Sequence, residues 1–260
     1  MAVKLTILGS GSGGNCAYIE TAEARILVDA GFSPRQIRKR LELIGRVPEN
    51  LTAILITHEH TDHIQGLTGI AQKLGIPIYC NRATKDEFEH ILETHFDCRL
   101  FETGGSFEIA DVLVDTFTLP HDAQDPVGFL LHTAAGNIGF VTDLGHMTKL
   151  VIERTRAANV LVLESNHDVK MLKECPHRSW PLKQRILGRH GHLSNEAAAE
   201  AVAQIMSADL RHLYLAHLSR ECNRPELAHY VMAEQLHHIG ATHVQLRLAA
   251  QDVPCATLEI

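Results

Sequence analysis

The chain has 260 residues, of which 45% are hydrophobic and 21% are charged, a composition typical of a globular protein with a sizeable core. The net charge of −7 argues against a general affinity for polyanions, although a metal site would supply positive charge locally. No run approaches the roughly 20 apolar residues of a membrane helix, and the first apolar run is too short for a signal peptide. We therefore expect a cytoplasmic protein without a membrane partner.

The first half of the chain alternates short apolar runs with amphipathic stretches. A glycine-rich segment from Gly9 to Asn15 separates the first two apolar runs, and Pro34 opens an amphipathic stretch in the position that proline favours in a first helical turn. Short apolar runs that end in turn residues predict buried strands. The predicted strands are 4–8, 16–19, 25–28, 53–56 and 76–79, and the predicted helices begin at Pro34 and Gly66.

The second half continues the same alternation. The predicted strands are 106–109, 112–118, 127–132, 137–141, 160–163 and 212–216, and the predicted helices are 147–156, 195–206 and 225–239. Ser194 or Asn195 is expected to cap the second of these helices. Since no low-complexity linker divides the halves, we expect a single α/β domain over residues 1–260, with sheets inside and helices outside.

Histidine and aspartate side chains recur where these predicted strands end. Strand ends in α/β proteins are where loops gather into functional sites on a rigid scaffold. The residues concerned are Asp29, His58, His121, Asp143 and His217.

The densest group is the run Thr57-His58-Glu59-His60-Thr61-Asp62-His63. His58 and His60 can reach one ion from a short loop, and Asp62 and His63 can point to a second. Imidazole and carboxylate groups are ligands that zinc, manganese and iron accept. The alternative, a solvated loop rich in histidine, is disfavoured because a buried strand and an apolar helix bracket the run.

This run resembles the HxHxDH signature of the metallo-β-lactamase superfamily, and the later His121, Asp143 and His217 follow in the order of that superfamily's later motifs. The resemblance implies a four-layer αββα sandwich whose site lies along one edge of two sheets. It also implies two divalent ions, zinc or manganese, with iron as a further option. The implied ligands are His58, His60 and His121 for the first ion, Asp62, His63 and His217 for the second, and Asp143 between them.

Asp29 matches the aspartate that braces the ligand loop in this superfamily, although a structural cap at the strand end is an equally simple interpretation. Other stretches resemble the YycJ/WalJ-type branch of the superfamily, which implies 5′→3′ exonuclease activity on DNA. Nothing between Asp143 and His217 is long enough to hold the β-CASP insertion of larger nucleases. The stretches that carry this resemblance are 8–16, 163–168, 180–186, 191–195 and 216–219.

A local basic stretch leads into the helix that Ser194 or Asn195 caps. Together with Ser194 and Asn195 it predicts contacts to a substrate phosphate at a helix N-terminus. The stretch comprises Lys183, Arg185, Arg189, His190 and His192. A solvated basic turn before an ordinary N-cap is the alternative. The glycine-rich segment lacks the Lys-Ser/Thr ending of a P-loop, so no nucleotide cofactor is expected.

The hypothesis that follows is hydrolysis of a phosphodiester by a hydroxide that bridges two metals. Asp62 would both ligate a metal and orient the nucleophile, and His192 would protonate the leaving 3′ oxygen unless it only caps a helix. One rival is a hydrolase of thioesters, lactones or cyclic phosphodiesters. Another is a non-catalytic, metal-stabilised regulatory protein, in which a lost ligand would be expected, and none is lost.

Overall fold

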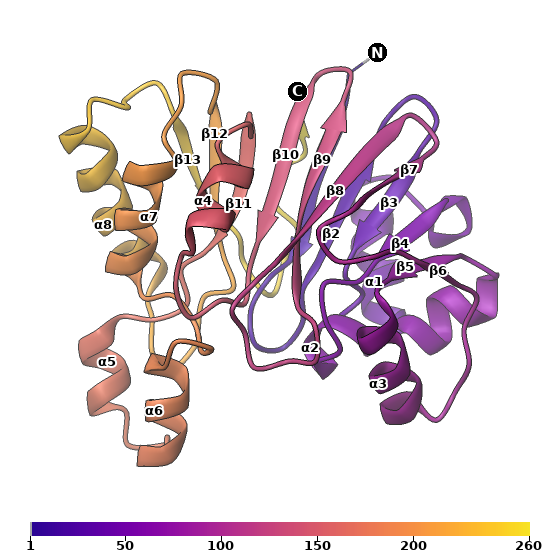
Figure 1. Ribbon diagram of the computed structural model, residues 1–260, viewed down its shortest axis with the longest axis horizontal. Helices are drawn as coiled ribbons and strands as arrows, with labels where there is room; N and C mark the ends of the chain where they lie inside the picture. The colour runs from indigo at the N-terminus through magenta and orange to yellow at the C-terminus, as the bar shows by residue number, and fades with distance from the viewer. Residues whose placement is uncertain (1) are drawn as a thin grey trace.

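The computed structural model describes residues 2–260 and contains two seven-stranded β-sheets that share one core (Figure 1). The strands of the first sheet are β1 (Lys4–Gly9), β2 (Cys16–Glu20), β3 (Arg25–Val28), β4 (Ala53–Leu55), β5 (Ile78–Cys80), β6 (Cys98–Leu100) and β14 (Leu258–Glu259). The strands of the second are β7 (Ser106–Ile109), β8 (Val112–Thr118), β9 (Val127–Thr133), β10 (Gly136–Val141), β11 (Val160–Glu164), β12 (His212–Ala216) and β13 (Gln245–Leu248).

The two sheets have matching topologies. The strand order is β14-β1-β2-β3-β4-β5-β6 in the first and β13-β12-β11-β10-β9-β8-β7 in the second. Each sheet joins an antiparallel part to a parallel part, which comprises β3 to β6 in the first sheet and β10 to β13 in the second. Because parallel strands end at the same edge, residues that follow β3, β4, β10, β11 and β12 are brought together.

Helices cover the outer face of each sheet, so the molecule has four layers (Figure 1). Side chains of β8 alternate between buried and exposed positions, whereas all five residues of β11 are buried because its other face lies under helices. The first sheet carries α1 (Pro34–Leu43), α2 (Thr61–Ile64), a π-helical turn (Thr68–Gln72) and α3 (Arg82–Leu92). The second carries α4 (Lys149–Thr155), α7 (Asn195–Ile205) and α8 (Pro225–His238).

Two further helices, α5 (Val169–Glu174) and α6 (Trp180–Leu187), project beyond the strand ends at the lower left of Figure 1. They share a small separate core made of Leu172, Cys175, Ile186 and Cys222. The intervening loop and the turn that follows α6 complete this projection, and we call residues 169–190 the basic lobe because it contains six lysines and arginines and one acidic residue.

The αββα sandwich is confirmed, and most predicted strands are present within one or two residues of their expected bounds. The helix predicted from Gly66 is present from residue 67 to residue 74, but its middle, Thr68–Gln72, is π-helical, and the short α2 that precedes it was not expected. Three strands and three helices were not predicted, namely β6, β13, β14, α3, α5 and α6.

Three residues at strand ends adopt the left-handed backbone conformation that non-glycine residues rarely visit. Asp29, Asp143 and His217 have φ angles of 60°, 63° and 55°. Such strain is tolerated where the surroundings fix it, and it concentrates at functional sites. Within residues 2–260, no helix combines the length and apolar character that crossing a bilayer demands.

Candidate metal centre

The ligand loop after β4 is held by backbone contacts to two neighbouring loops. The carbonyl oxygen of Asp62 accepts a hydrogen bond from the Asn15 backbone N–H at 2.8 Å, and that of His63 accepts one from Ala30 at 2.8 Å. Gly31 lies so close to this loop that a Cβ atom would stand 1.6 Å from the Asp62 carbonyl oxygen. Glycine is therefore required at this approach, and the positions of Asp62 and His63 depend on it.

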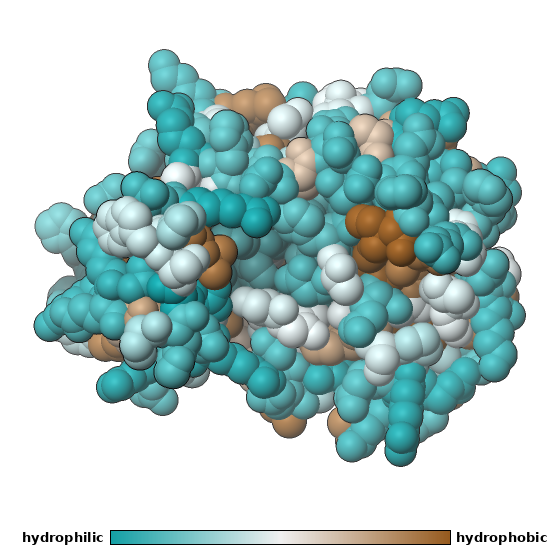
Figure 2. Space-filling view, turned by 90° about the horizontal axis from the view of Figure 1, so that it is seen from below, coloured by the Kyte–Doolittle hydropathy of each residue, from teal (hydrophilic) through white to brown (hydrophobic). Residues whose placement is uncertain are grey.

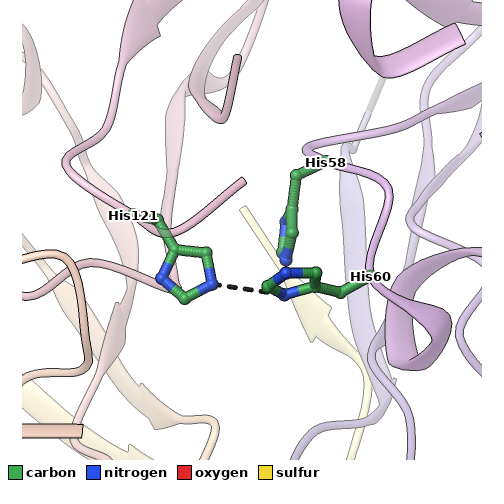
Figure 3. A group of neighbouring side chains, drawn as sticks. All are labelled: His58, His60 and His121. Atoms are coloured by element: carbon green, nitrogen blue, oxygen red, sulfur yellow. Dashed lines mark hydrogen bonds between the residues drawn. The ribbon is translucent and has the colours of Figure 1, made fainter. Parts of the chain in front are cut away.

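Three histidines gather at the first candidate metal position (Figure 3). His58 and His60 come from the ligand loop of the first sheet, and His121 comes from the loop after β8 of the second. The Nε2 atom of His121 lies 3.3 Å from Nδ1 of His60, and the ring centroids of His58 and His121 are 5.1 Å apart. The group thus spans the two sheets, as the sequence predicted for strand ends.

Asp62, His63 and His217 form the adjoining group, which Asp143 joins to the first. Asp143 Oδ2 lies 3.3 Å from His63 Nε2, and its Oδ1 lies 3.2 Å from His217 Nδ1 and 4.0 Å from His121 Nε2. His217 Nε2 is 3.5 Å from Asp62 Oδ2. All seven predicted ligands therefore lie around one centre, with Asp143 in the middle.

Four of the histidines have one ring nitrogen engaged by an outer partner, which leaves the other for the centre. His63 Nδ1 meets Asp29 Oδ2 at 2.8 Å, and His58 Nδ1 meets Thr57 Oγ1 at 3.0 Å. His121 Nδ1 lies 3.1 Å from the carbonyl oxygen of Gly191, and His217 Nδ1 lies 2.7 Å from Glu164 Oε1. Outer partners of this kind fix the ring orientation of metal-binding histidines.

A second observation also fits divalent metal ions, because several buried polar atoms of these side chains form no hydrogen bond within residues 2–260. His58 Nε2, His217 Nε2 and Asp143 Oδ2 are all buried without a hydrogen bond. An unsatisfied buried polar atom costs about 1–3 kcal/mol, so three at one centre are unfavourable unless something binds there. Imidazole nitrogens and carboxylate oxygens together are the donor set that zinc and manganese take.

Charges inside the site point the same way. Burial opposes protonation of His63, but facing carboxylates, led by Asp29, outweigh it and raise the pKa of this histidine well above its usual range. Burial also opposes ionisation of Asp143, yet His217 and His63 lower the pKa of its carboxyl well below its usual range. The group formed by Asp62, His63, His217 and Asp143 therefore stabilises positive charge, which divalent ions supply. Burial lowers the pKa of His58 and His121, which favours the neutral imidazole that binds metals.

Glu164, at the end of β11, is a site residue that the sequence reasoning missed. It is fully buried, and its Oε1 accepts from His217 Nδ1 at 2.7 Å and from His192 Nδ1 at 2.8 Å. Its Oε2 accepts from the backbone N–H groups of Leu193 and Leu144. Burial alone would raise its pKa, but the histidines lower it to about 2. Its place after an apolar strand was the available signal, the same one that identified Asp29 and Asp143.

A cavity of about 250 Å³ opens onto the candidate ligands. Seen from below in Figure 2, this face is hollowed and mostly hydrophilic. His192 lines the cavity, as does Arg185, whose Nε makes an ion pair with Asp122 at 2.6 Å. His190, from the basic stretch predicted to bind phosphate, also lines the cavity. The lining residues that the sequence had not assigned to the site are Ser12, Asn166, Arg178, Leu182, Ile186 and Gly191.

Three residues predicted to contact substrate do not line this cavity. Lys183 is buried and its Nζ donates to the Lys173 carbonyl oxygen at 2.7 Å. Ser194 caps α7 by accepting from the Ala197 backbone N–H. Asn195 is buried, where its side chain bonds to Ser165 and Asn223. These side chains are engaged in holding the fold, so their placement favours the structural interpretation that the sequence left open.

A model of the Beta-lactamase superfamily domain matches residues 24–218, a segment that contains every candidate metal ligand. The exodeoxyribonuclease WalJ of Streptococcus pneumoniae is 39% identical over 237 residues, which cover 90% of this chain and 88% of that protein. The exodeoxyribonuclease YycJ of Bacillus anthracis is 35% identical over 245 residues, which cover 92% and 91%.

Solved structures support the fold. The metallo-β-lactamase fold protein YhfI of Bacillus subtilis superimposes with a TM-score of 0.73 at 17% identity, covering 100% of this chain and 99% of that one. The short form of human tRNase Z gives 0.67 at 18% identity, covering 97% and 98%. The chain belongs to the metallo-β-lactamase superfamily, in its YycJ/WalJ-type branch.

Proposed function

We propose that this protein is a 5′→3′ DNA exonuclease that depends on two divalent metal ions, zinc or manganese. The observation that carries the proposal is the gathering of all seven candidate ligands, with Asp143 in the middle. It is combined with identity of 35–39% to exodeoxyribonucleases over about nine-tenths of the chain. His58, His60 and His121 would hold one ion. Asp62, His63 and His217 would hold the other, with Asp143 between them.

Bound at these residues, divalent ions would supply activation of water and stabilisation of negative charge on the phosphoryl oxygens. The part played by the chain itself is positioning. Asp62 is only partly buried and lines the cavity, so its carboxylate can accept a hydrogen bond from the attacking water. The buried outer partners Asp29 and Glu164 keep His63 and His217 turned toward the centre.

His192 is the proposed proton donor to the leaving 3′ oxygen. Its Nδ1 is held by Glu164 Oε1 at 2.8 Å, and its ring lines the cavity between His121 and His217, at centroid distances of 5.1 Å and 5.2 Å. With Nδ1 engaged by a carboxylate, Nε2 is the nitrogen that can give a proton to the substrate.

Residues 2–260 act as one domain without a β-CASP insertion, since the chain between Asp143 and His217 contains α4, β11, the basic lobe and α7. A cytoplasmic location agrees with the six cysteines, all of which are free thiols.

The test uses the purified chain, reloaded separately with manganese and zinc, on 5′-phosphorylated single- and double-stranded DNA labelled at either end. We expect stepwise release of mononucleotides from the 5′ end, lost in Asp143→Ala and retained in Asp115→Ala. Asp115 is a matched control because it pairs with His132 in the second sheet and does not line the cavity.

The rival substrates are tested in parallel with thioesters, lactones, cyclic phosphodiesters and bis-(p-nitrophenyl) phosphate. Hydrolysis of one of these without cleavage of DNA under any metal would reject the exonuclease while keeping the metal centre. No hydrolysis of any substrate, together with metal binding, would favour the non-catalytic regulatory protein.

A further inference from the structure

The basic lobe, residues 169–190, carries a charge opposite to that of the rest of the chain. It holds six lysines and arginines against one acidic residue, Glu174, in a chain whose net charge is −7. The lobe projects beyond the strand ends (Figure 1), and its residues line the same cavity as the candidate metal ligands. A concentrated positive element on an acidic protein attracts polyanions locally while the rest of the surface repels them.

One face of α6 forms a wall of the cavity. Leu182, Arg185 and Ile186 line the cavity at a spacing that places them on one side of a helix, and Arg178 lines it just before α6 begins. The wall therefore combines an apolar surface with two guanidinium groups. This combination suits a nucleotide, whose base has flat, apolar faces and whose phosphates are charged.

The cavity continues past the end of α6 as a second hollow. The two hollows share His121, Arg185 and His190, and the second is also lined by Arg189. Among residues 2–260 no carboxylate pairs with the guanidinium of Arg189, whose Nη2 lies 3.2 Å from Nε2 of His146. The arginines at 178, 185 and 189 thus line two adjoining hollows, which we call the groove, and the first hollow contains candidate metal ligands.

Two ion pairs tie this groove to the loops that carry metal ligands. Arg185 Nε lies 2.6 Å from Asp122 Oδ2, and Asp122 directly follows His121. Arg178 Nε lies 3.1 Å from Glu221 Oε2, on the loop that follows His217. The Arg185–Asp122 pair is exposed, and Arg178 is partly buried while Glu221 is exposed, so solvent screens both pairs and a phosphate can replace either carboxylate at little cost.

We propose that the basic lobe is the DNA-binding element of this protein, with Arg178, Arg185 and Arg189 contacting successive backbone phosphates of the strand that enters the metal centre. On binding, phosphates replace Asp122 and Glu221 as partners of Arg185 and Arg178. This inference rests on the proposed exonuclease function, and it names the residues that hold the polymer rather than those that cleave it.

The test is equilibrium binding of a 5′-phosphorylated, 3′-fluorescent single-stranded oligonucleotide whose phosphorothioate linkages resist hydrolysis, followed by anisotropy. We expect Arg185→Gln and Arg178→Gln each to weaken binding roughly tenfold. Replacing all three arginines should reduce the slope of log K against log salt by about 2, since each phosphate contact to a single strand contributes about 0.7.

Substitution of the carboxylates should change DNA affinity in the opposite direction. Asp122→Asn and Glu221→Gln remove the competing partners, so each should tighten binding up to roughly fivefold. Glu49→Gln and Arg38→Gln are matched controls, because Arg38 and Glu49 form a comparably exposed pair on the first sheet's side and lie outside both hollows. The controls should change binding less than twofold, and thermal unfolding of each variant reports whether it is folded.

Failure of this inference is distinguishable from failure of the proposed function. If the wild type degrades DNA from the 5′ end but the folded arginine and carboxylate variants bind like the controls, the lobe is not the DNA-binding element and the exonuclease stands. If the wild type neither binds nor degrades DNA while hydrolysing a small ester or diester, the exonuclease is rejected, and the lobe inference falls with it.

Discussion

We call the sheet edge that carries the seven candidate metal ligands the metal-ligand edge. This edge and the basic lobe border the same cavity, yet their charged groups are held in different ways. At the edge, His63, His217 and Asp143 are buried, and two of the candidate ligands have left-handed backbone angles. In the lobe, Arg185 has an exposed side chain that makes one ion pair, and Arg189 contacts only a histidine ring. The first arrangement holds each group by several buried contacts, and the second lets partners exchange.

This difference matches two different tasks. Metal chemistry needs a set of ligands whose spacing does not change during the reaction, which buried and mutually bonded groups provide. A polymer that must advance after each cleavage needs contacts that release easily, which exposed cations provide. Perturbing the edge should therefore cost stability and metal affinity, while perturbing the lobe should cost mainly DNA affinity.

The largest expected effect is that of metal on stability. With metal at about a thousand times its dissociation constant, binding to the native state adds about 4 kcal/mol to the free energy of unfolding, or about 10 °C in the melting temperature. Calorimetry with metal and with a chelator measures this difference. Asp143→Ala should abolish most of it and Arg185→Gln should keep it. If metal stabilises Asp143→Ala as much as the wild type, Asp143 is not a metal ligand.

Glu164→Gln should have the next largest effect. The carboxylate accepts four hydrogen bonds, and glutamine offers one acceptor oxygen, so about two buried donors lose their partners. We expect a loss of about 2–4 kcal/mol in the free energy of unfolding and a 10- to 100-fold loss in metal affinity. Denaturant unfolding and metal titration measure the two. Glu153→Gln, in an exposed pair with Arg156, is the control. Unchanged metal affinity would mean that Glu164 is only a structural group.

Gly31→Ala should displace the backbone of the ligand loop that carries Asp62 and His63. The new Cβ would stand 1.6 Å from the Asp62 carbonyl oxygen, so the ligand loop must move. Overpacking of this kind costs about 1–3 kcal/mol, and here it should also weaken metal binding. Gly105→Ala is the control, since its closest contact would be 3.0 Å and it lies in a turn away from the cavity. Wild-type metal affinity in Gly31→Ala would show that the loop absorbs the shift.

The sequence predicted the site residues well where a polar residue directly follows an apolar strand. A polar residue after an apolar strand identified Asp29, His58, Asp143 and His217, because strand ends meet at one edge whatever the loops do. Glu164 obeys the same rule and was missed because no ligand pattern surrounds it. The short β6 and β14 were missed because their pairing depends on partners distant in sequence.

The basic lobe was where sequence reasoning failed in detail. A run of cations indicated phosphate binding, but charge alone does not say which side of a helix faces a cavity. Arg185 faces it, whereas Lys183, two residues earlier, turns to the α5 backbone. The i, i+3 and i+4 spacing of α6 separates the two positions, but only once the helix itself is known. Arg178 lay outside the predicted stretch and is brought to the cavity by the turn before α6.

The smallest expected effect decides the role of Lys183. Its Nζ joins α6 to the Lys173 carbonyl at the end of α5, and methionine keeps the buried aliphatic stem while losing that bond. Lys183→Met should lower the free energy of unfolding by about 1 kcal/mol. Lys170→Met removes the same charge from an exposed position of the lobe and should leave stability within about 0.5 kcal/mol. Because both variants remove one charge from the lobe, both should weaken DNA binding equally and by less than threefold. If Lys183→Met instead weakens binding as much as Arg185→Gln does, its ammonium reaches the substrate, and the lobe is mobile enough to release it from α5.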